Sequence, residues 1–434
     1  MSTRRARLWR ALGWSPLLLV LLCFVPWTFS GSSMAPASTP LGSPAPRPGA
    51  AAAVRPSPAP TPTPGLAAMV STVEAQTSAL RGLAPLRDVP VEIVEPASLQ
   101  AWAEGEIARN QNAELVRCRT EVLVHLGLAD PTLDLRRLSL DLLSSQVLGQ
   151  YDPTTRSLTL VNRAGKTLAP LRITVAHEYT HALQDQHFGL AAVGLGPSRA
   201  LPVDRELALQ ALVEGDASHL VGTWMQRHVT ADERAQVDQL VAAASPPALP
   251  PVLTRQLAFP YVEGAAFAEA LYAAGGWARI DAAYARPPSS SAEILHPERY
   301  LAGWRPATVE PLHLAPSSLA DGWHQICGET LGELGLQAWL TSLRGGPGET
   351  PLPQDEAEAL AGHWAGDELA LWEHGESWAL GWTMVWDSDT AAASFAEAAG
   401  ATAGAMRQLD RDGARVTLRL AADAASLQIA TAAQ

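Results

Sequence analysis

The sequence predicts an α+β fold that is predominantly helical. Apolar residues recur at helical spacing through most of the chain after residue 66, whereas strand-like alternation appears in residues 149–161 and again after residue 355. At 434 residues, the chain is also longer than one compact domain usually is. We therefore expect a main helical domain over 66–345 and a small α+β unit over 355–434.

The first 30 residues have the pattern of a targeting segment. Four arginines among the first ten residues are followed by an apolar run over 11–29. A basic start followed by an apolar run is the order of a secretory signal peptide or of a signal anchor. The run has about nineteen residues, near the lower limit for crossing a bilayer. We expect an extracytoplasmic protein, either secreted or anchored to the membrane through residues 11–29.

Residues 31–65 are rich in proline, alanine, serine and threonine. Proline at this density blocks helices and sheets and favours an extended, solvated linker. We expect residues 31–65 to form a disordered spacer between the targeting segment and the folded domain.

Composition argues against two classes of site. The net charge is −13 and no basic stretch balances it, so nucleic acid is not an expected partner. The three cysteines are Cys23, Cys118 and Cys327, and no two are spaced as a CxxC pair, which excludes a structural zinc site built from cysteine. Cys118 and Cys327 are either one disulfide or two separate thiols.

The first part of the folded chain alternates between helical and strand patterns. Helical spacing covers residues 66–86, 98–128 and 130–148. Residues 149–161 follow as strand, turn and strand, with Asp152-Pro153 at the turn. We therefore expect a short β-hairpin directly before the next helix.

That next helix carries two histidines one turn apart. His177 and His181 differ by about 40° around a helix, so both imidazoles leave the same face. This spacing suits two ligands of one tetrahedral zinc ion, and Glu178 is placed to reach a metal-bound water. The uncharged neighbours on both sides fit a buried helix. The alternative is a buried amphipathic helix whose histidines make ordinary hydrogen bonds.

His177-Glu178-Tyr179-Thr180-His181 resembles the HExxH segment of the zincin metallopeptidases. The resemblance is specific over about fifteen residues. It implies a zincin-like catalytic domain, zinc bound by His177 and His181, and Glu178 as general base. It also implies that an edge strand of the preceding hairpin pairs with an extended peptide substrate.

Two residues compete as the third zinc ligand. His187 has the spacing of a third histidine in metzincins, but Gln184 stands where those proteins need a turn-forming glycine. Glu214, in the helical run 204–220, resembles the carboxylate that completes the site in gluzincins. We therefore expect Glu214 to be the third ligand and the protein to be most like the gluzincin group. Asp185, Glu206 and Asp216 are the remaining alternatives.

The residues after Glu214 suggest further roles in such a site. Gly215 and Ala217 are small enough to let the second helix approach the metal helix closely. Asp216 is a candidate for orienting a ligand histidine through its second ring nitrogen. Zincin mechanisms also need a donor to a developing oxyanion. The candidates for this donor are His219, Tyr261 and His296, each of which has a packing or capping role as its alternative.

The C-terminal part is expected to mix strands and helices. Helices are predicted over 322–343 and, after a linker over 345–354, through about residue 362. An apolar helix that follows residues 259–264 and runs to about residue 274 should break at Gly275-Gly276. Strands are predicted over 368–372, 378–386, 415–420 and 427–431, with a helix over 389–409. Five tryptophans in this part form either a recognition surface or, as is commoner for such alternation, an aromatic core.

These observations predict an exported zinc-dependent metallopeptidase that acts on peptides or proteins. Zinc would lower the pKa of a bound water, and Glu178 would transfer its proton. One alternative is a zincin-derived surface or binding protein in which hydrolysis is lost or secondary. Another is a zinc hydrolase that acts on a non-peptide amide.

Overall fold

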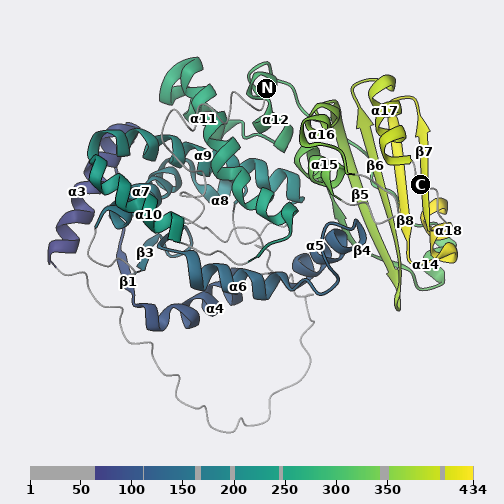
Figure 1. Cartoon of the computed structure of the whole chain (residues 1–434), viewed down its shortest axis with the longest axis horizontal. Coiled ribbons are helices and arrows are strands. Elements are labelled where there is room, and N and C mark those ends of the chain that lie inside the picture. The colour runs from purple at the N-terminus through teal and green to yellow at the C-terminus, as the bar shows by residue number, and fades with distance from the viewer. Residues whose placement is uncertain are drawn as a thin grey trace, which may run out of the picture.

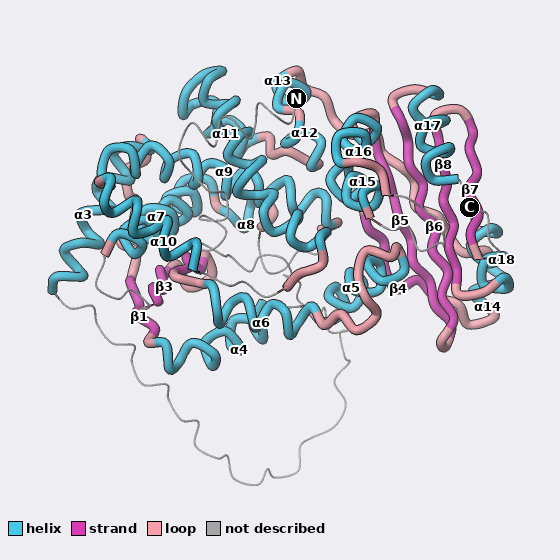
Figure 2. The backbone as a smooth tube through the Cα atoms, in the orientation of Figure 1, coloured by secondary structure: helices cyan, strands magenta, loops and turns pink. Residues whose placement is uncertain are grey.

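A computed structural model describes residues 64–110, 112–161, 168–195, 201–243, 248–342, 351–400 and 406–433. The predicted targeting segment and nearly all of the predicted linker lie outside these residues. The fold is mixed α+β, with most of the described chain in helices and the strands in two separate sheets, as the sequence predicts (Figure 2). None of the described helices combines the length and the apolar character needed to cross a membrane.

The smaller sheet has three strands and contains the predicted hairpin. Its order is β1-β3-β2, with β1 parallel and β2 antiparallel to β3. The hairpin turn is closed by Asp152, whose carboxylate accepts a hydrogen bond from the Thr154 N–H at 2.7 Å. The first strand was not predicted from its four residues. The strands are β1 (Val91–Val94), β2 (Gly149–Asp152) and β3 (Ser157–Val161).

One predicted helix is two helices in the structure. The prediction of a continuous helix over 98–128 is wrong because Asn112 caps a new helix. Its side-chain oxygen accepts hydrogen bonds from the N–H groups of Glu114 and Leu115. The first helices are α3 (Pro64–Arg81), α4 (Leu99–Asn110), α5 (Ala113–His125) and α6 (Leu135–Gln146), with a short 3₁₀ turn, η2 (Pro96–Ser98), before α4.

Two long helices, α9 and α11, cross beside α7 and form the centre of the helical part (Figure 1). They approach closely because a Cβ on Gly215 would lie 2.1 Å from the Gly264 carbonyl oxygen. Gly215 therefore serves the α9–α11 contact and not, as predicted, the approach to the metal helix. The predicted break at Gly275-Gly276 is present inside α11. The helices of this region are α7 (Ala169–Phe188), α8 (Leu190–Val193), α9 (Val203–His228), α10 (Ala231–Ala243) and α11 (Pro251–Ala285).

The larger sheet is antiparallel, with the order β4-β5-β6-β8-β7. Figure 1 places α15 and α16 between this sheet and the helical part. The short helices that precede it are α12 (Ser291–Leu295), α13 (Pro297–Leu301) and α14 (Pro316–Ala320). The remaining elements are β4 (His324–Glu329), α15 (Gly332–Thr341), α16 (Gln354–Ala361), β5 (Trp364–His374), β6 (Ser377–Trp386), α17 (Asp389–Gly400), β7 (Arg407–Asp412), β8 (Arg415–Ala421) and α18 (Ala424–Ala432).

Three C-terminal predictions need correction. The expected helix over 322–343 is a strand, β4, followed by α15, and the expected helix over 389–409 ends at Gly400 and gives way to β7. The expected strand over 427–431 is part of α18, because Asp423 caps a helix there by accepting the Ser426 N–H at 2.7 Å. β4 lies before the expected boundary at 355, yet it pairs with β5 and is therefore part of the C-terminal sheet.

Both faces of the larger sheet are covered, which explains its buried tryptophans. Leu369 and Leu371 face one apolar cluster, whereas Ala370 and Trp372 face another, as the period of two in a strand requires. Four of the five tryptophans, Trp364, Trp372, Trp382 and Trp386, are at most 2% exposed, which confirms the core interpretation for them.

A disulfide joins the two parts of the molecule. Cys118 on α5 is bonded to Cys327 on β4, 209 residues later, with Cα atoms 5.6 Å apart. Around it, Val122 and Leu123 of α5 and Leu126, which follows the helix, belong to the same apolar cluster as the sheet. Of the two alternatives for these cysteines, the structure has the disulfide.

Candidate metal centre

Helix α7 carries both motif histidines and the motif glutamate through the protein interior. His177, Glu178 and His181 are at most 1% exposed. The uncharged neighbours Val175, Ala176, Ala182 and Leu183 are fully buried, so the helix is enclosed on all sides near the motif. It begins with proline in its first turn, where no N–H partner is needed, and ends at Gly189, which has a φ of 69°.

Three potential ligand atoms converge between α7 and α9. His177 Nε2 lies 3.0 Å from Glu214 Oε2 and 3.1 Å from His181 Nε2, and His181 Nε2 lies 3.3 Å from the same carboxylate oxygen. In a tetrahedral zinc site with bonds of about 2.0–2.1 Å, ligand atoms are separated by about 3.3–3.4 Å. The observed spacing and the pairing of two imidazoles with a carboxylate therefore fit a zinc ion.

The charges of this cluster are strongly coupled. Burial alone would lower the pKa of His181, but the adjacent Glu214 carboxylate more than offsets it and raises that pKa to about 9. Burial would likewise raise the pKa of Glu214, but His181 and His177 lower it to about 2. Without a metal, the cluster is thus held together by an ion pair between Glu214 and His181.

Gln184 fixes the orientation of the His181 ring. Its Nε2 donates to the Val213 carbonyl and to Asp216 Oδ2, both at 3.0 Å. Because both partners only accept, the amide oxygen must face His181 Nδ1, which lies 2.8 Å away and therefore carries a proton. The neutral imidazole then presents a lone pair on Nε2, the atom that faces the other two ligands.

Asp216 holds the Gln184 amide in place by accepting its N–H. It accepts hydrogen bonds from Arg81 at 2.9 and 3.1 Å and from the Tyr284 hydroxyl at 2.8 Å. The predicted role of Asp216 in orienting a ligand histidine is thus indirect, since Gln184 lies between them. Arg81 is 1% exposed and stacks over Trp277. Its part in the site was not predicted, because its partners lie 135 and 200 residues away.

The two carboxylate oxygens of Glu178 differ: one accepts a hydrogen bond and the other is buried without a partner among the described residues. Its Oε2 accepts the backbone N–H of Tyr151 on β2 at 2.7 Å. Within the described part of the chain, Oε1 has no hydrogen-bond partner. Since β2 is an edge strand, its outer side faces this glutamate. The Tyr151 side chain is buried elsewhere, with its hydroxyl bonded to Asp185 at 2.9 Å.

The other predicted site residues divide into near and distant ones. The Tyr261 ring stacks beside His177 with centroids 6.2 Å apart. His219 packs against Tyr272 and Trp277, and burial lowers its pKa. His296 bonds to Glu333 on α15 at 2.9 Å and is not part of the cluster.

His187 does not join the ligand cluster either. Helix α7 continues through Phe188, and His187 Nε2 lies 2.7 Å from the Ala84 carbonyl oxygen. In the part of the chain that the structure describes, three potential metal ligands lie close together in one place. They are His177, His181 and Glu214, whose ligand atoms are all within 4.8 Å of one another.

Comparisons with known proteins bear on the C-terminal unit alone. A family profile described as "Domain of unknown function (DUF8575)" matches residues 320–431, a span that runs from the end of α14 to α18. No curated protein and no solved structure matches the chain. The matched segment lies wholly after the cluster formed by α7 and α9.

Proposed function

We propose that this protein is an exported zinc-dependent metallopeptidase of gluzincin type. The observation that carries the proposal is the convergence of His177 Nε2, His181 Nε2 and Glu214 Oε2 within 3.3 Å in the protein interior. Two imidazoles and one carboxylate are the ligand set of several catalytic zinc sites, which keep a fourth position for water. Zinc bound there would polarise that water and lower its pKa toward neutrality.

Glu178 is suited to move the proton. Its Oε1 is buried and has no hydrogen-bond partner among the described residues, so it is available to accept one. The backbone N–H of Tyr151 holds the other oxygen and fixes the carboxylate in place. Glu178 would take a proton from the attacking water and pass it to the leaving amine, a role worth roughly 10²- to 10⁴-fold in rate.

β2 offers a way to bind an extended peptide. It is an edge of the three-stranded sheet, and its Tyr151 N–H is directed toward Glu178. A peptide that pairs with such an edge gains main-chain hydrogen bonds with little demand on its sequence. The carbonyl to be attacked would then be held beside the general base.

The disulfide supports an extracytoplasmic location. Bonds such as Cys118–Cys327 persist in oxidising compartments and are rare in the cytosol. This agrees with the basic and apolar pattern of the first 30 residues. The buried tryptophans give no support to the alternative of a partner-binding surface in the C-terminal unit.

The test is the hydrolysis of unfolded casein by the zinc-loaded protein and by Glu178→Gln. We expect Glu178→Gln to retain zinc and to lose at least about 100-fold in rate. Glu333→Gln is a matched control, since Glu333 is also a buried glutamate beside a histidine, in this case His296. Full activity in Glu178→Gln would refute the proposal, as would a zinc-loaded wild type that cleaves no protein.

A further inference from the structure

An open groove lies between α3, the segment that follows α3, and α7. It has a volume of about 850 Å³. One wall is a single stripe of α3, and the other is the chain over residues 82–89. Tyr179 of α7 also lines the groove and, because it is only 4% exposed, lies at its floor. The stripe of α3 consists of Ser71, Glu74, Ala75, Ser78 and Ala79.

Two carboxylates in this groove have no cationic partner among the described residues. They belong to Glu74 on α3 and to Asp88 in the segment that follows it. Burial raises the pKa of Glu74, and the charge of Asp88 raises it further, so the two carboxylates are close enough to repel each other. Arg87 also lines the groove, but it is paired with Asp185 at 2.6 Å. The groove therefore carries an excess of negative charge.

The Tyr179 hydroxyl is a second group in the groove that is open to a ligand. Its ring packs with Leu83 and Tyr151 in an apolar cluster. Its hydroxyl has no hydrogen-bond partner in the part of the chain that the structure describes. Burial raises the pKa of this hydroxyl to about 12, and Glu74 and Asp88 contribute to the increase, which places both carboxylates near it. A protonated hydroxyl can accept a hydrogen bond from a cation bound between them.

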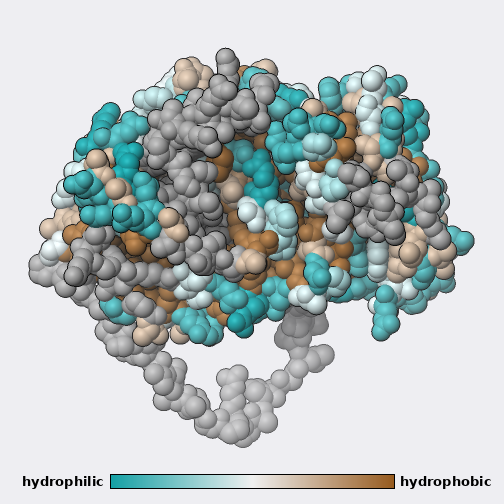
Figure 3. All heavy atoms as spheres, in the orientation of Figure 1, coloured by the Kyte–Doolittle hydropathy of each residue, from teal (hydrophilic) through white to brown (hydrophobic). Residues whose placement is uncertain are grey.

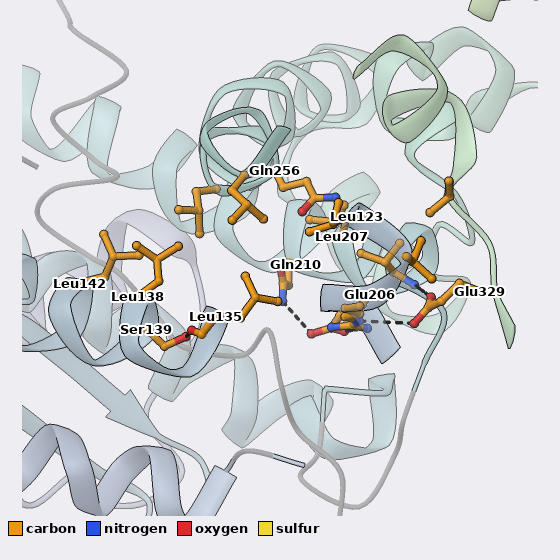
Figure 4. Close-up of a pocket in the computed structure, with 16 residues that line it drawn as sticks. Leu123, Leu135, Leu138, Ser139, Leu142, Glu206, Leu207, Gln210, Gln256 and Glu329 are labelled. Atoms are coloured by element: carbon orange, nitrogen blue, oxygen red, sulfur yellow. Dashed lines mark hydrogen bonds and ion pairs between the residues drawn. The ribbon is translucent and has the colours of Figure 1, made fainter. Parts of the chain in front are cut away.

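The carboxylates of a second cavity, between α5, α6, α9 and α11, have opposite surroundings. Arg119 donates to Glu206 at 2.6 Å and to Glu329 at 3.4 Å, and Gln210 donates to Glu206 at 3.2 Å (Figure 4). That cavity is walled mostly by leucines, and on the face shown in Figure 3 hydrophobic residues gather between the helical part and the sheet. There the chain itself supplies the cation, whereas Glu74 and Asp88 are left to solvent or to a ligand.

The groove suits an arginine side chain better than a metal ion. No group of three potential metal ligands is found in it among the described residues. The small apolar side chains of Ala75 and Ala79 can cover the methylene stem of an arginine, whose planar head forms paired hydrogen bonds with carboxylates. In addition, α3 ends at Arg81 beside the groove, and the C-terminal end of a helix attracts cations.

We propose that this groove binds an arginine side chain of a polypeptide, with the guanidinium between Glu74, Asp88 and the Tyr179 hydroxyl. Its volume is that of a site for a ligand much larger than one side chain, so the occupant is a segment of polypeptide and not free arginine. None of the three candidate zinc ligands lines the groove, and the inference therefore stands without the proposed peptidase function. For a peptidase, the groove would hold the substrate at a second place, away from the cleaved bond.

The test measures the binding of the peptide acetyl-Ala-Ala-Arg-Ala-Ala-amide by isothermal titration calorimetry. The control ligand is the same peptide with citrulline, which has the shape of arginine without its charge. N-acetyl-L-argininamide shows whether a single residue is sufficient. The zinc-loaded parent protein carries Glu178→Gln, so that the peptide is not hydrolysed.

Two changes are made in this parent protein. Tyr179→Phe removes the hydroxyl and keeps the ring, and Glu74→Gln with Asp88→Asn removes both charges. The matched control is Asp355→Asn with Glu356→Gln, which removes two adjacent carboxylates from the first turn of α16. Thermal unfolding of each variant shows that the fold persists.

We expect the parent to bind the arginine peptide about tenfold more tightly than the citrulline peptide, because hydrogen bonds between charged groups are the stronger ones. The double variant at Glu74 and Asp88 should lose this preference. Tyr179→Phe should weaken binding of the arginine peptide by about 2- to 10-fold. The α16 control should bind both peptides as the parent does.

Three outcomes would overturn the proposal. The first is equal binding of the arginine and citrulline peptides, or a preference that survives in the double variant. The second is binding of N-acetyl-L-argininamide as tight as that of the peptide, which would indicate a site for a small guanidinium compound. The third is displacement of the peptide by calcium chloride but not by sodium chloride of equal ionic strength, which would indicate a metal site. Because no readout depends on hydrolysis, a failure of the peptidase proposal would leave the result interpretable.

Discussion

Two buried carboxylates in this protein, Glu214 and Asp367, have opposite surroundings. Both are 4% exposed. Asp367 on β5 accepts four N–H groups, from the backbone of Leu331 and Gly332 and from the indoles of Trp364 and Trp382, at 2.8–3.1 Å. Glu214 instead faces the Nε2 atoms of two histidines, and the Nε2 of His181 presents a lone pair when that ring is neutral.

The difference separates a structural carboxylate from a candidate ligand. All the contacts of Asp367 are donors that cannot bind a metal, and they fix the start of α15 against the sheet. The Glu214 cluster brings acceptors together and leaves His177 Nδ1 and Glu178 Oε1 buried without partners among the described residues. Buried polar atoms normally have hydrogen bonds, although unpartnered ones also occur elsewhere among the described residues, for example at Trp372 and Trp386.

The largest effect should come from replacing Asp367, and it should be a loss of folding stability. Asp367→Ala leaves four buried N–H groups unpaired, each costing about 1–3 kcal/mol. We expect a loss of at least about 3 kcal/mol in the free energy of unfolding, measured by urea denaturation. Zinc affinity under native conditions should not change. A stability equal to that of wild type would mean that Asp367 is not a structural anchor.

A smaller effect should follow when the orientation of His181 is disturbed. Gln184→Leu removes the acceptor of the Nδ1 proton, and we expect zinc affinity to fall about 10- to 100-fold, as for other partners of ligand histidines. Competition with a chelating dye measures it. The control is Gln186→Leu, because Gln186 lies on the same helix but bonds to the backbone of Leu86 and Arg87. Equal affinities in both variants would contradict the role of Gln184.

An effect of similar size should follow from a change of pH. His181 has a pKa of about 9 in the folded, metal-free protein, and zinc binds only its unprotonated form. Apparent zinc affinity should therefore rise by about tenfold per pH unit from pH 7 and level off above pH 9. Glu214, with a pKa of about 2, stays ionised throughout. An affinity that is flat between pH 7 and 9 would show that no proton is displaced.

The metal-free protein should show the opposite trend in stability. The folded pKa of His181 lies above its usual value of 6.5, so the ion pair with Glu214 contributes fully below pH 6.5. That contribution is lost as pH rises through about 9. Thermal unfolding of the metal-free protein across this range measures the loss.

The spacing of residues along the sequence predicted the three candidate ligands, but it did not predict the residues that position them. The i, i+4 histidines and the carboxylate of a second helix required only helical periodicity, and the structure brings the three side chains together. Gln184 was considered only as a residue that replaces a turn-forming glycine. Its partners, Asp216 and the Val213 carbonyl, come from another helix, and no local pattern reveals such contacts.

The errors in the fold have the same origin. The apolar residues of 427–431 alternate as in a strand, but the Asp423 cap and the packing of α18 on β6 and β8 favour a helix. Residues 324–329 were assigned to a helix, yet they pair with β5 through β4. In both places, contacts with distant strands outweigh the local preference.

The most direct test of the account is the zinc content and affinity of wild type, Glu214→Ala and Glu206→Ala. Glu206 is a buried glutamate about two turns earlier on α9, paired with Arg119, and serves as the control. We predict one zinc per chain in wild type and in Glu206→Ala, and a loss of affinity on the order of 1000-fold in Glu214→Ala. Unchanged zinc binding in Glu214→Ala, or no zinc in the wild type, would contradict the proposed metal centre.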